Sequence, residues 1–565
     1  MRPLSLFAAL SALVLSSCFS PGDGQAPPLE SLYFPTGLVL DPAAQPAADA
    51  QVSEPAYLYV ASSDFDLQYR SSSLISFSLE RMRQVVPQSC SAQTEQLDCA
   101  LGEHCDSEPS AANGFVPSFF CVPGDGPYAG QPCREYGPRS AADRLLNPGR
   151  CNSVDPIAPQ NGELTLIRDK VGIGAFATDV ISRFDEQSGK GRLFLPVRGD
   201  ATVHWIDLND GLFACDQEQT DDHSCAGSHR AGNTASANDN GIRQPSEPFA
   251  IDATEDGTYL AVTNQTAGSV SLFATKPSAW NEGPKLVTIL GGLPQAPVAI
   301  ATLPAPDSRL VGEDEPPGFL VAYRNAPQVD LLRVRLDQPV VGSADNYSRY
   351  ALTWAGTAAI NANSIGFDSR GIVIDAEQRD NDYLACQASH CPDLSEACLA
   401  AYKSCALAVH QPNIYVANRA PSSLLVGSMT ADYSYRAGTN ELPSFIDSVA
   451  LSSGPSRVVL GHVKVPGALY HDLHGSYDLE RRVFVICFDS RRVFVYDPKR
   501  RVIDSIVSTG RGPYAFTVDE ARGLGYVAHF TDSYLGVISL DQRFPQTYAT
   551  IVASIGNPSP PRSSK

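Results

Sequence analysis

Short hydrophobic runs recur along most of the chain and are separated by turns rich in Gly, Pro, Asp and Asn. The clearest unit consists of residues 512–519, 524–529 and 534–540, which predict three strands joined by tight turns. Related units start at Pro35 and Pro248, and in each of them the first strand opens near Pro and closes on Asp. This pattern predicts an all-β chain built from one repeated unit of consecutive strands.

Weaker copies bring the predicted number of units to seven, at residues 176–207, 297–334, 414–426 and 483–507. Strands such as residues 483–488 are hydrophobic on both faces, as expected when each sheet packs between two neighbouring sheets. A row of sandwich domains is the alternative all-β interpretation. Sandwiches, however, give no recurring strand that opens on Pro and closes on Asp.

The segments that match one repeat pattern best are YLAVTN at residues 259–264 and IYVAN at residues 414–418. Both resemble the YVTN-type repeat of seven-bladed propellers of the lactonase-like and surface-layer kind. The resemblance implies a seven-bladed β-propeller of four-stranded antiparallel blades over residues 32–556. It concerns architecture only, because the catalytic residues of lactonase-like propellers cannot be placed on this chain.

The beginning of the chain has the pattern of an export signal, with Arg2 followed by a hydrophobic run over residues 4–15. The sequence Leu-Ser-Ser before Cys18 resembles a bacterial lipobox, which implies cleavage before Cys18 and attachment of lipid to it. An ordinary signal peptide is the alternative. Phe19, in place of Asp, favours sorting to the outer membrane. It does not indicate which leaflet of that membrane holds the lipid. We therefore expect a signal peptide at residues 1–17, a lipidated flexible tether at 18–31 and a disordered tail at 557–565.

The composition narrows the range of partners. The net charge is −20, and such an acidic surface repels nucleic acids and anionic lipid head groups. Neither is expected to bind. Contact with the membrane is expected through the lipid on Cys18, and no other cofactor is predicted.

Fourteen cysteines are present. Cys18 is assigned to lipid, and Cys487 falls in a predicted strand, where it is expected to be a buried, inert thiol. The others lie in insertions at residues 81–160, 208–245 and 376–411. The three groups are Cys90, Cys99, Cys105, Cys121, Cys133 and Cys151; Cys215 and Cys225; and Cys386, Cys391, Cys398 and Cys405. Because each group is even in an exported chain, we predict local disulfides, with the pairing inside the first group left open.

The third insertion, residues 376–411, is expected to be helical, with one helix over residues 393–407. Such a helix separates Cys398 from Cys405 by ~10 Å, beyond the ~7 Å Cα limit for a disulfide. Each of the two is therefore expected to pair with Cys386 or Cys391. No pair of cysteines has the Cys-x-x-Cys spacing of a zinc site, so thiolate-bound metal is disfavoured.

Propellers usually bind their ligands at the mouth of the central channel. The residues that end the second strand of each unit are therefore candidate ligand-binding residues. They are Ser62, Arg198, Asn264, Arg324, Asn418, Asp489 and His529. Two arginines in such a ring would suit carboxylate or phosphate groups, whereas the favoured alternative is that each residue satisfies a turn.

His471, His474 and His529, with Asp472 and Asp489, form a weak candidate for a metal site. His471 and His474 are three residues apart, and residues of odd separation on a strand point to opposite faces, which disfavours the site. The sequence contains no nucleophile elbow, zinc-protease motif, P-loop or dinucleotide-binding fingerprint.

These observations favour a non-catalytic protein-interaction or scaffold role at the cell envelope, with an envelope protein as partner. The first and third insertions are expected on the face opposite the Arg198 ring, where that partner would dock. The first alternative is an envelope hydrolase or lactonase that uses Arg324, Asp489 or His529. The second alternative is a carbohydrate- or peptidoglycan-binding module, for which exposed Tyr323 or Trp280 would be the sign.

Overall fold

The computed structural model describes residues 24–41, 54–91, 95–108, 117–126, 129–132, 141–146, 151, 153–157, 165–185, 189–216, 223–238, 240–275, 282–305, 316–336, 350–360, 367–393, 395–406, 408–429, 442–467 and 477–556. The predictions for the signal peptide, the tail, Cys18, Cys133, Trp280, His471, Asp472 and His474 lie outside these residues.

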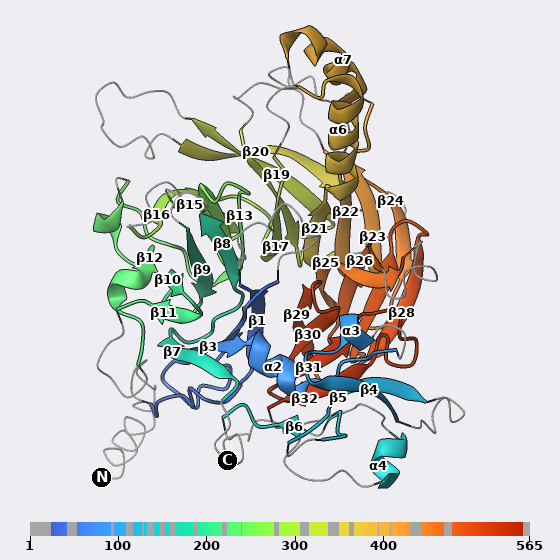
Figure 1. Ribbon diagram of the computed structural model, residues 1–565. Helices are drawn as coiled ribbons and strands as arrows, with labels where there is room; N and C mark the ends of the chain where they lie inside the picture. The colour runs from blue at the N-terminus through green and yellow to red at the C-terminus, as the bar shows by residue number, and fades with distance from the viewer. Residues whose placement is uncertain are drawn as a thin grey trace, which may run out of the picture.

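Seven antiparallel sheets surround a central axis, which confirms the predicted seven-bladed propeller (Figure 1). From the innermost strand outward, blades one to three are β1 (Pro35–Leu40), β2 (Tyr57–Ser62), β3 (Ser72–Ser78) and β7 (Ile167–Ile173); β8 (Ile181–Asp185), β9 (Lys190–Val197), β10 (Thr202–Asn209) and β11 (Leu212–Ala214); and β13 (Pro248–Ala253), β14 (Tyr259–Asn264), β15 (Ser269–Ala274) and β16 (Lys285–Leu290).

Blades four to seven follow the same order. They are β17 (Pro297–Thr302), β18 (Gly318–Tyr323), β19 (Gln328–Leu336) and β20 (Tyr350–Ala359); β21 (Phe367–Asp375), β22 (Asn413–Ala420), β23 (Ser422–Met429) and β24 (Pro443–Ala450); β25 (Pro455–Pro466), β26 (Tyr477–Cys487), β27 (Arg492–Asp497) and β28 (Val502–Ser508); and β29 (Pro513–Asp519), β30 (Leu524–His529), β31 (Tyr534–Ser539) and β32 (Ile551–Ile555). The red seventh blade lies beside the blue first blade, so the ring closes (Figure 1).

The hydrophobic core lies between the blades. Every residue of β14 is buried, and one core cluster joins Ala261 and Val270 of blade three to Phe319 and Val321 of blade four. Both faces of a middle strand are therefore covered, which explains why the strand sequences are hydrophobic on both sides. A blade on its own would leave two such faces in water.

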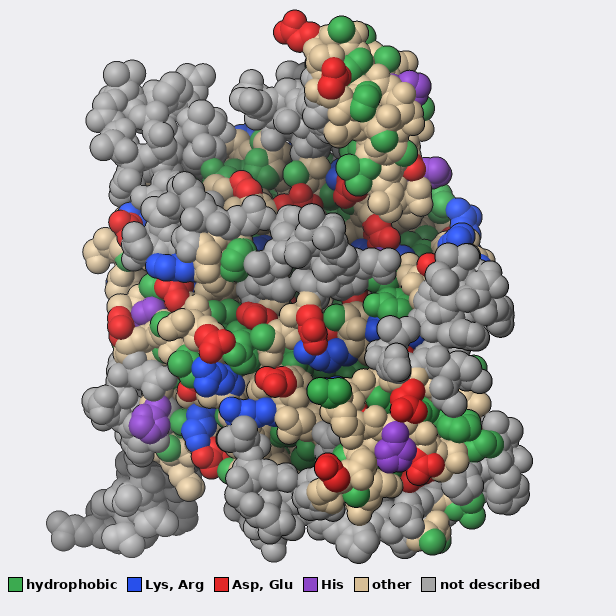
Figure 2. All heavy atoms as spheres, in the orientation of Figure 1, with side chains coloured by type: hydrophobic (Ala, Val, Ile, Leu, Met, Phe, Trp, Pro, Cys, Tyr) green, Lys and Arg blue, Asp and Glu red, His purple; other side chains and the backbone are tan. Residues whose placement is uncertain are grey.

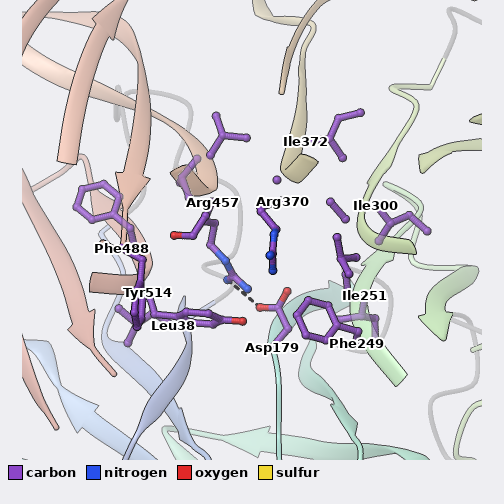
Figure 3. A pocket seen from close by; sticks show the side chains of 18 of the residues that line it. Leu38, Asp179, Phe249, Ile251, Ile300, Arg370, Ile372, Arg457, Phe488 and Tyr514 are labelled. Carbon is purple, nitrogen blue, oxygen red and sulfur yellow. Dashed lines mark hydrogen bonds and ion pairs between the residues drawn. The ribbon is translucent and has the colours of Figure 1, made fainter. Parts of the chain in front are cut away.

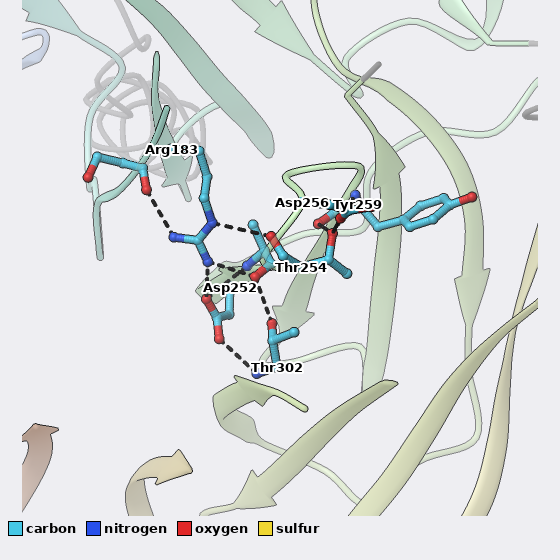
Figure 4. A network of polar contacts seen from close by, with 8 residues as sticks. Arg183, Asp252, Thr254, Asp256, Tyr259 and Thr302 are labelled. Atoms are coloured by element: carbon cyan, nitrogen blue, oxygen red, sulfur yellow. Dashed lines mark hydrogen bonds and ion pairs between the residues drawn. The ribbon is translucent and has the colours of Figure 1, made fainter. Parts of the chain in front are cut away.

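The Asp that closes an innermost strand connects neighbouring blades (Figure 4). Asp252 of blade three accepts a hydrogen bond from Arg183 Nη2 of blade two at 3.0 Å and from the backbone N–H of Thr302 of blade four at 2.8 Å. Likewise, Asp375 of blade five is 3.1 Å from Arg481 of blade six. In these two blades the Asp joins neighbouring blades, whereas Asp519 accepts hydrogen bonds from Arg522 of its own blade.

Each innermost strand is entered through one residue with positive φ. These residues are Phe34, Phe176, Glu247, Ala296, Asp368, Gly454 and Gly512. In blade seven the carbonyl of Gly512 accepts the N–H of Phe530 at 2.7 Å, which ties the start of the first strand to the end of the second. The strand pairing then shifts by one residue, for example between Pro513 and Ala515. Such a bulge re-aims the intervening side chain, here Tyr514, toward the channel.

The insertions contain the remaining elements, which are α2 (Leu79–Val85), α3 (Glu95–Asp98), β4 (Glu103–Glu108), β5 (Ser118–Pro123), α4 (Ala141–Leu146), β6 (Ser153–Val154), η2 (Gly227–His229), β12 (Arg230–Ala231), η3 (Ala235–Ala237), α6 (Glu377–His390) and α7 (Glu396–Ala406). Among the described residues, no helix is long and apolar enough to cross a membrane.

Disulfides staple the insertions, as predicted. They join Cys90 to Cys105, Cys99 to Cys121, Cys215 to Cys225, Cys386 to Cys405 and Cys391 to Cys398. Cys398 and Cys405 therefore pair with Cys391 and Cys386, as their helical spacing requires, and Cys151 is also disulfide-bonded. Cys487 is a free, buried thiol whose pKa is raised to about 12 by burial.

Part of the predicted tether packs against blade one. The carbonyl of Gln25 accepts a hydrogen bond from the N–H of Arg70 at 3.2 Å, and Leu29 is buried. The described residues 24–31 are thus held on the propeller, because Leu29 and the Pro residues next to it pack against its surface.

Candidate functional site at the channel mouth

A cavity of about 480 Å³ occupies the channel where the innermost strands begin (Figure 3). All seven innermost strands or the residues that lead into them line it. Its volume is within the usual range of ~300–1,000 Å³ for small-molecule sites. The cavity is therefore the candidate functional site.

Charged groups enter the cavity from three blades. Arg457 of blade six donates a 2.9 Å hydrogen bond from Nη1 to Asp179 Oδ1, just ahead of β8 in blade two (Figure 3). Burial raises the pKa of Asp179, and the guanidinium of Arg457 opposes that shift. The guanidinium also lies 5.5 Å from the ring centre of Tyr514, a cation–π contact. This pair holds one carboxylate and one guanidinium at fixed positions in the channel.

The charge of the described cavity lining is positive. Arg370, Arg419 and Arg457 line it, against the single carboxylate of Asp179. Arg370 pairs with Asp368, which also lies 3.8 Å from Arg324, so two guanidiniums share one carboxylate. In a protein of net charge −20, this local excess of guanidinium favours an anion at the mouth.

Aromatic rings form one wall of the mouth. The ring centre of Phe530 is 5.2 Å from Phe65, 5.9 Å from Tyr514 and 6.2 Å from Phe488. Phe65 is 56% exposed at the rim, and Phe249 faces the same cavity from blade three. These rings offer flat apolar surface next to the guanidiniums.

The seven candidate residues predicted at the second-strand ends occupy three different positions relative to the residue that pairs with the start of the innermost strand. Ser62, Asn264 and His529 are the last paired residues of their strands, and Asn418 holds the equivalent position opposite Ser369. All four are buried in their blades. Arg198 and Arg324 are one residue further along, and Asp489 is two further. A shift of one residue turns a side chain to the other face, so the seven residues do not form one ring.

The buried members satisfy their own blades, as the alternative interpretation expected. Asn264 donates to the hydroxyls of Ser269 and Ser271 at 3.1 and 3.0 Å, and Asn418 donates to the carbonyl of Pro421 at 3.0 Å. Of the exposed members, Arg198 pairs with Glu247 and Asp489 pairs with Arg419.

His529 is unsuited to a charged role. Burial lowers its pKa to about 4, its Nε2 accepts the N–H of Gly510 at 3.1 Å, and its ring stacks on Tyr534. Tyr323, named as a possible sugar-stacking residue, is fully buried and donates its hydroxyl proton to Asp330 at 2.6 Å. Tyr323 is therefore not available to a glycan.

Sequence reasoning missed Asp179, Arg370, Arg419 and Arg457. Arg370 and Tyr514 each occupy the bulge that follows the strand-opening residue. The recurring Pro marks that opening in unit six, where Pro455 precedes Arg457 by two residues, whereas Asp179 and Arg370 follow Thr178 and Ser369 and have no such signal. Arg419 follows Asn418 by one residue and lines the cavity, whereas Asn418 is buried.

Fold and cavity together place the chain among seven-bladed β-propellers with a ligand-sized cavity at the channel mouth. No protein-family model and no curated protein matches it. Several solved structures are similar in fold. They are a Lactobacillus plantarum protein (TM-score 0.38, 11% identity, covering 85% of this chain and 86% of that one), a Bacteroides uniformis protein provisionally assigned as a 6-phosphogluconolactonase (0.38, 12%, 84% and 89%) and the Pseudomonas aeruginosa periplasmic gluconolactonase (0.36, 14%, 63% and 77%). At these identities the likeness is one of fold alone.

Proposed function

We propose that this chain is a non-catalytic binding protein of the bacterial cell envelope, anchored to the outer membrane by lipid on Cys18. Its channel-mouth cavity holds a small organic carboxylate, and its insertions contact an envelope protein. The observation that carries the ligand class is the excess of guanidinium over carboxylate in the described cavity lining. Guanidinium groups bind carboxylates through paired, charge-assisted hydrogen bonds.

Arg370, which lies in the bulge that aims its side chain at the channel, is the arginine to which we assign the ligand. Arg457 is engaged with Asp179 across the channel, and Arg419 pairs with Asp489. Arg370 donates to Asp368 from Nε and Nη2, and a guanidinium has five N–H donors. The two N–H groups of Nη1 and the second N–H of Nη2 therefore face away from Asp368 and can bind a ligand carboxylate.

The test is titration calorimetry of the full-length Cys18→Ser chain, purified without detergent, against organic carboxylates and their uncharged amides. We expect carboxylates to bind and the amides to bind at least about tenfold more weakly, because charge-assisted hydrogen bonds contribute ~1.5–3 kcal/mol. Arg370→Met should weaken carboxylate binding by a similar factor. The control, Arg168→Met, removes an exposed arginine that pairs with Asp210 away from the cavity. Equal affinity for acid and amide would refute the proposal.

A hydrolase that uses the same cavity is the second candidate function, favoured by the fixed Asp179 carboxylate beside the guanidinium of Arg457. A carboxylate can act as a general base while a guanidinium stabilises an oxyanion. If this candidate is correct, the same preparation turns over lactones, and Asp179→Asn abolishes turnover. Binding without turnover supports the non-catalytic role.

The partner-binding part rests on where the insertions lie. Arg379 of α6 donates to the carbonyl of Ala305 at 3.1 Å, and Ser89 contacts Thr547 at 2.8 Å, so both insertions lie where innermost strands end, opposite the channel mouth. The α6–α7 hairpin projects from the body with hydrophobic side chains among its polar ones (Figure 2). Leu384 of α6 is 64% exposed.

The hairpin can be removed cleanly because it emerges between Asp375 and Asn413, which are paired neighbours on β21 and β22. Replacing residues 376–412 with Asn-Gly should close the strands through a two-residue turn. Crosslinking in living cells followed by purification from the membrane fraction should then lose a protein that the parent chain retains. Leu384→Glu, which keeps the hairpin, should give the same loss. An unchanged set of crosslinked proteins in both variants would contradict this part.

A further inference from the structure

A ring of apolar residues surrounds the channel just below the polar groups. Each innermost strand supplies one of them, and all line the cavity: Leu38, Ile181, Ile251, Ile300, Ile372, Val458 and Phe516. Six of the seven are buried, with 3–8% of their surface exposed. We call this set the apolar collar; four of its members are labelled in Figure 3.

The collar lies deeper in the channel than the arginine that faces the ligand. Arg370 occupies the bulge at the start of β21, and Ile372 follows two residues later on the same strand. At ~3.3 Å per residue, Ile372 lies about 6 Å further from the mouth than Arg370. The same two-residue step separates Phe249 from Ile251 and Val298 from Ile300. A ligand that pairs with Arg370 and enters the channel therefore meets the collar.

We infer that the ligand is an amphipathic monocarboxylate, with its carboxylate on Arg370 and an alkyl or aryl body against the apolar collar and the aromatic wall. This inference rests on the proposed carboxylate-binding function and adds the chemistry of the ligand's body. Removing the apolar surface of the ligand from water supplies the affinity, and the paired guanidinium fixes the orientation.

A polyhydroxylated sugar acid suits this cavity less well. Its hydroxyl groups would lose hydrogen bonds to water at the depth of Ile251, Ile300 and Ile372, and burying a hydroxyl without a partner is unfavourable. Among the described lining residues at or below the collar, Thr517 is the one with a side-chain hydroxyl. A single hydroxyl cannot satisfy a polyol.

The experiment is a chain-length series, measured by calorimetry on the detergent-free Cys18→Ser chain: butanoate, hexanoate, octanoate and decanoate, with benzoate and 2-naphthoate as flat acids and gluconate as the polar acid. Each buried methylene contributes enough to tighten binding by about fourfold, so affinity should rise steadily along the series. Arg370→Met should weaken every acid. Ile372→Thr, and Ile251→Thr on another blade, should weaken octanoate and leave butanoate unchanged. The control Ile506→Thr alters an exposed isoleucine on the outer strand β28.

The outcomes separate the two proposals. Affinity that rises with chain length, depends on Arg370 and falls in the collar variants supports the inference. Tighter binding of naphthoate than of benzoate extends it to ligands with a planar aromatic body. Affinity that is flat along the series, or highest for gluconate, while still dependent on Arg370, overturns the amphipathic ligand and leaves the carboxylate site standing. The absence of Arg370-dependent binding by any acid overturns both.

Discussion

His462 of blade six is held between two carboxylates from different parts of the molecule. Its Nε2 is 2.8 Å from Glu377, the first residue of α6, and its Nδ1 is 2.7 Å from Glu520 in blade seven. Arg481 also lies 3.1 Å from Glu377. Burial lowers the pKa of His462, but the two carboxylates outweigh that effect and raise it to about 9. The charged imidazole therefore ties the α6–α7 hairpin to two blades.

This geometry predicts a defined pH dependence of stability. Because the pKa is higher in the folded state than the unfolded value of about 6.5, the stabilisation is complete below pH ~6.5 and is lost as pH rises through about 9. We expect His462→Gln to lower the free energy of unfolding by about 2 kcal/mol at pH 6 and by little at pH 10. Denaturant unfolding at the two pH values measures the difference. His410→Gln, at an exposed ion pair with Asp382, is the control and should have little effect at either pH. A pH-independent loss in His462→Gln would contradict the charged bridge.

At the level of elements, the sequence was sufficient to predict strands and blades because both faces of the middle strands are hydrophobic. It was not sufficient to choose, at the end of a second strand, between a residue that is buried and its neighbour that faces the mouth. Asn264 is buried whereas the next residue, Gln265, is partly exposed, and Tyr323 is buried whereas the Arg324 side chain is 46% exposed. The choice depends on the positive-φ residue and the bulge at the start of the first strand, which no hydrophobic pattern records.

The helices, too, were predicted only in part from the sequence. The helical prediction for residues 393–407 located α7, and its cysteine spacing gave the correct pairing constraint. The longer α6 lies in the insertion that was predicted to be helical, but its bounds were not predicted, because its sequence is largely polar and has few apolar residues to mark a buried face. Tyr383, Cys386 and Arg379 are nevertheless buried, against α7 and blade four. Tertiary contacts and the Cys386–Cys405 disulfide define this helix more than its local pattern does.

At the scale of the whole molecule, the ring depends on the contact between its first and last blades. The short strand β6, which belongs to the insertion of blade one, adds in parallel to β32 at the outer edge of blade seven. The N–H of Gly556 donates to the carbonyl of Val154 at 2.8 Å, and the N–H of Cys151 donates to Val552 at 3.0 Å. One core cluster contains Val154 together with residues of both blades. The insertion of blade one therefore helps to hold the first and last blades together, in addition to covering part of one face.

The contact between blades one and seven predicts which part of the propeller a destabilising substitution should affect first. Val154 is 3% exposed, so Val154→Asp buries a charge in the contact between blades one and seven and should lower the melting temperature by several degrees. The matched control, Val502→Asp, changes a valine that is 49% exposed on β28 and should leave it nearly unchanged. In hydrogen exchange, amides of β1, β6 and β29–β32 should lose protection first, whereas those of blades three to five should keep it, because each blade contacts only its neighbours. Protection lost equally in all blades would mean that the ring opens as one cooperative unit and that β6 is not its closing element.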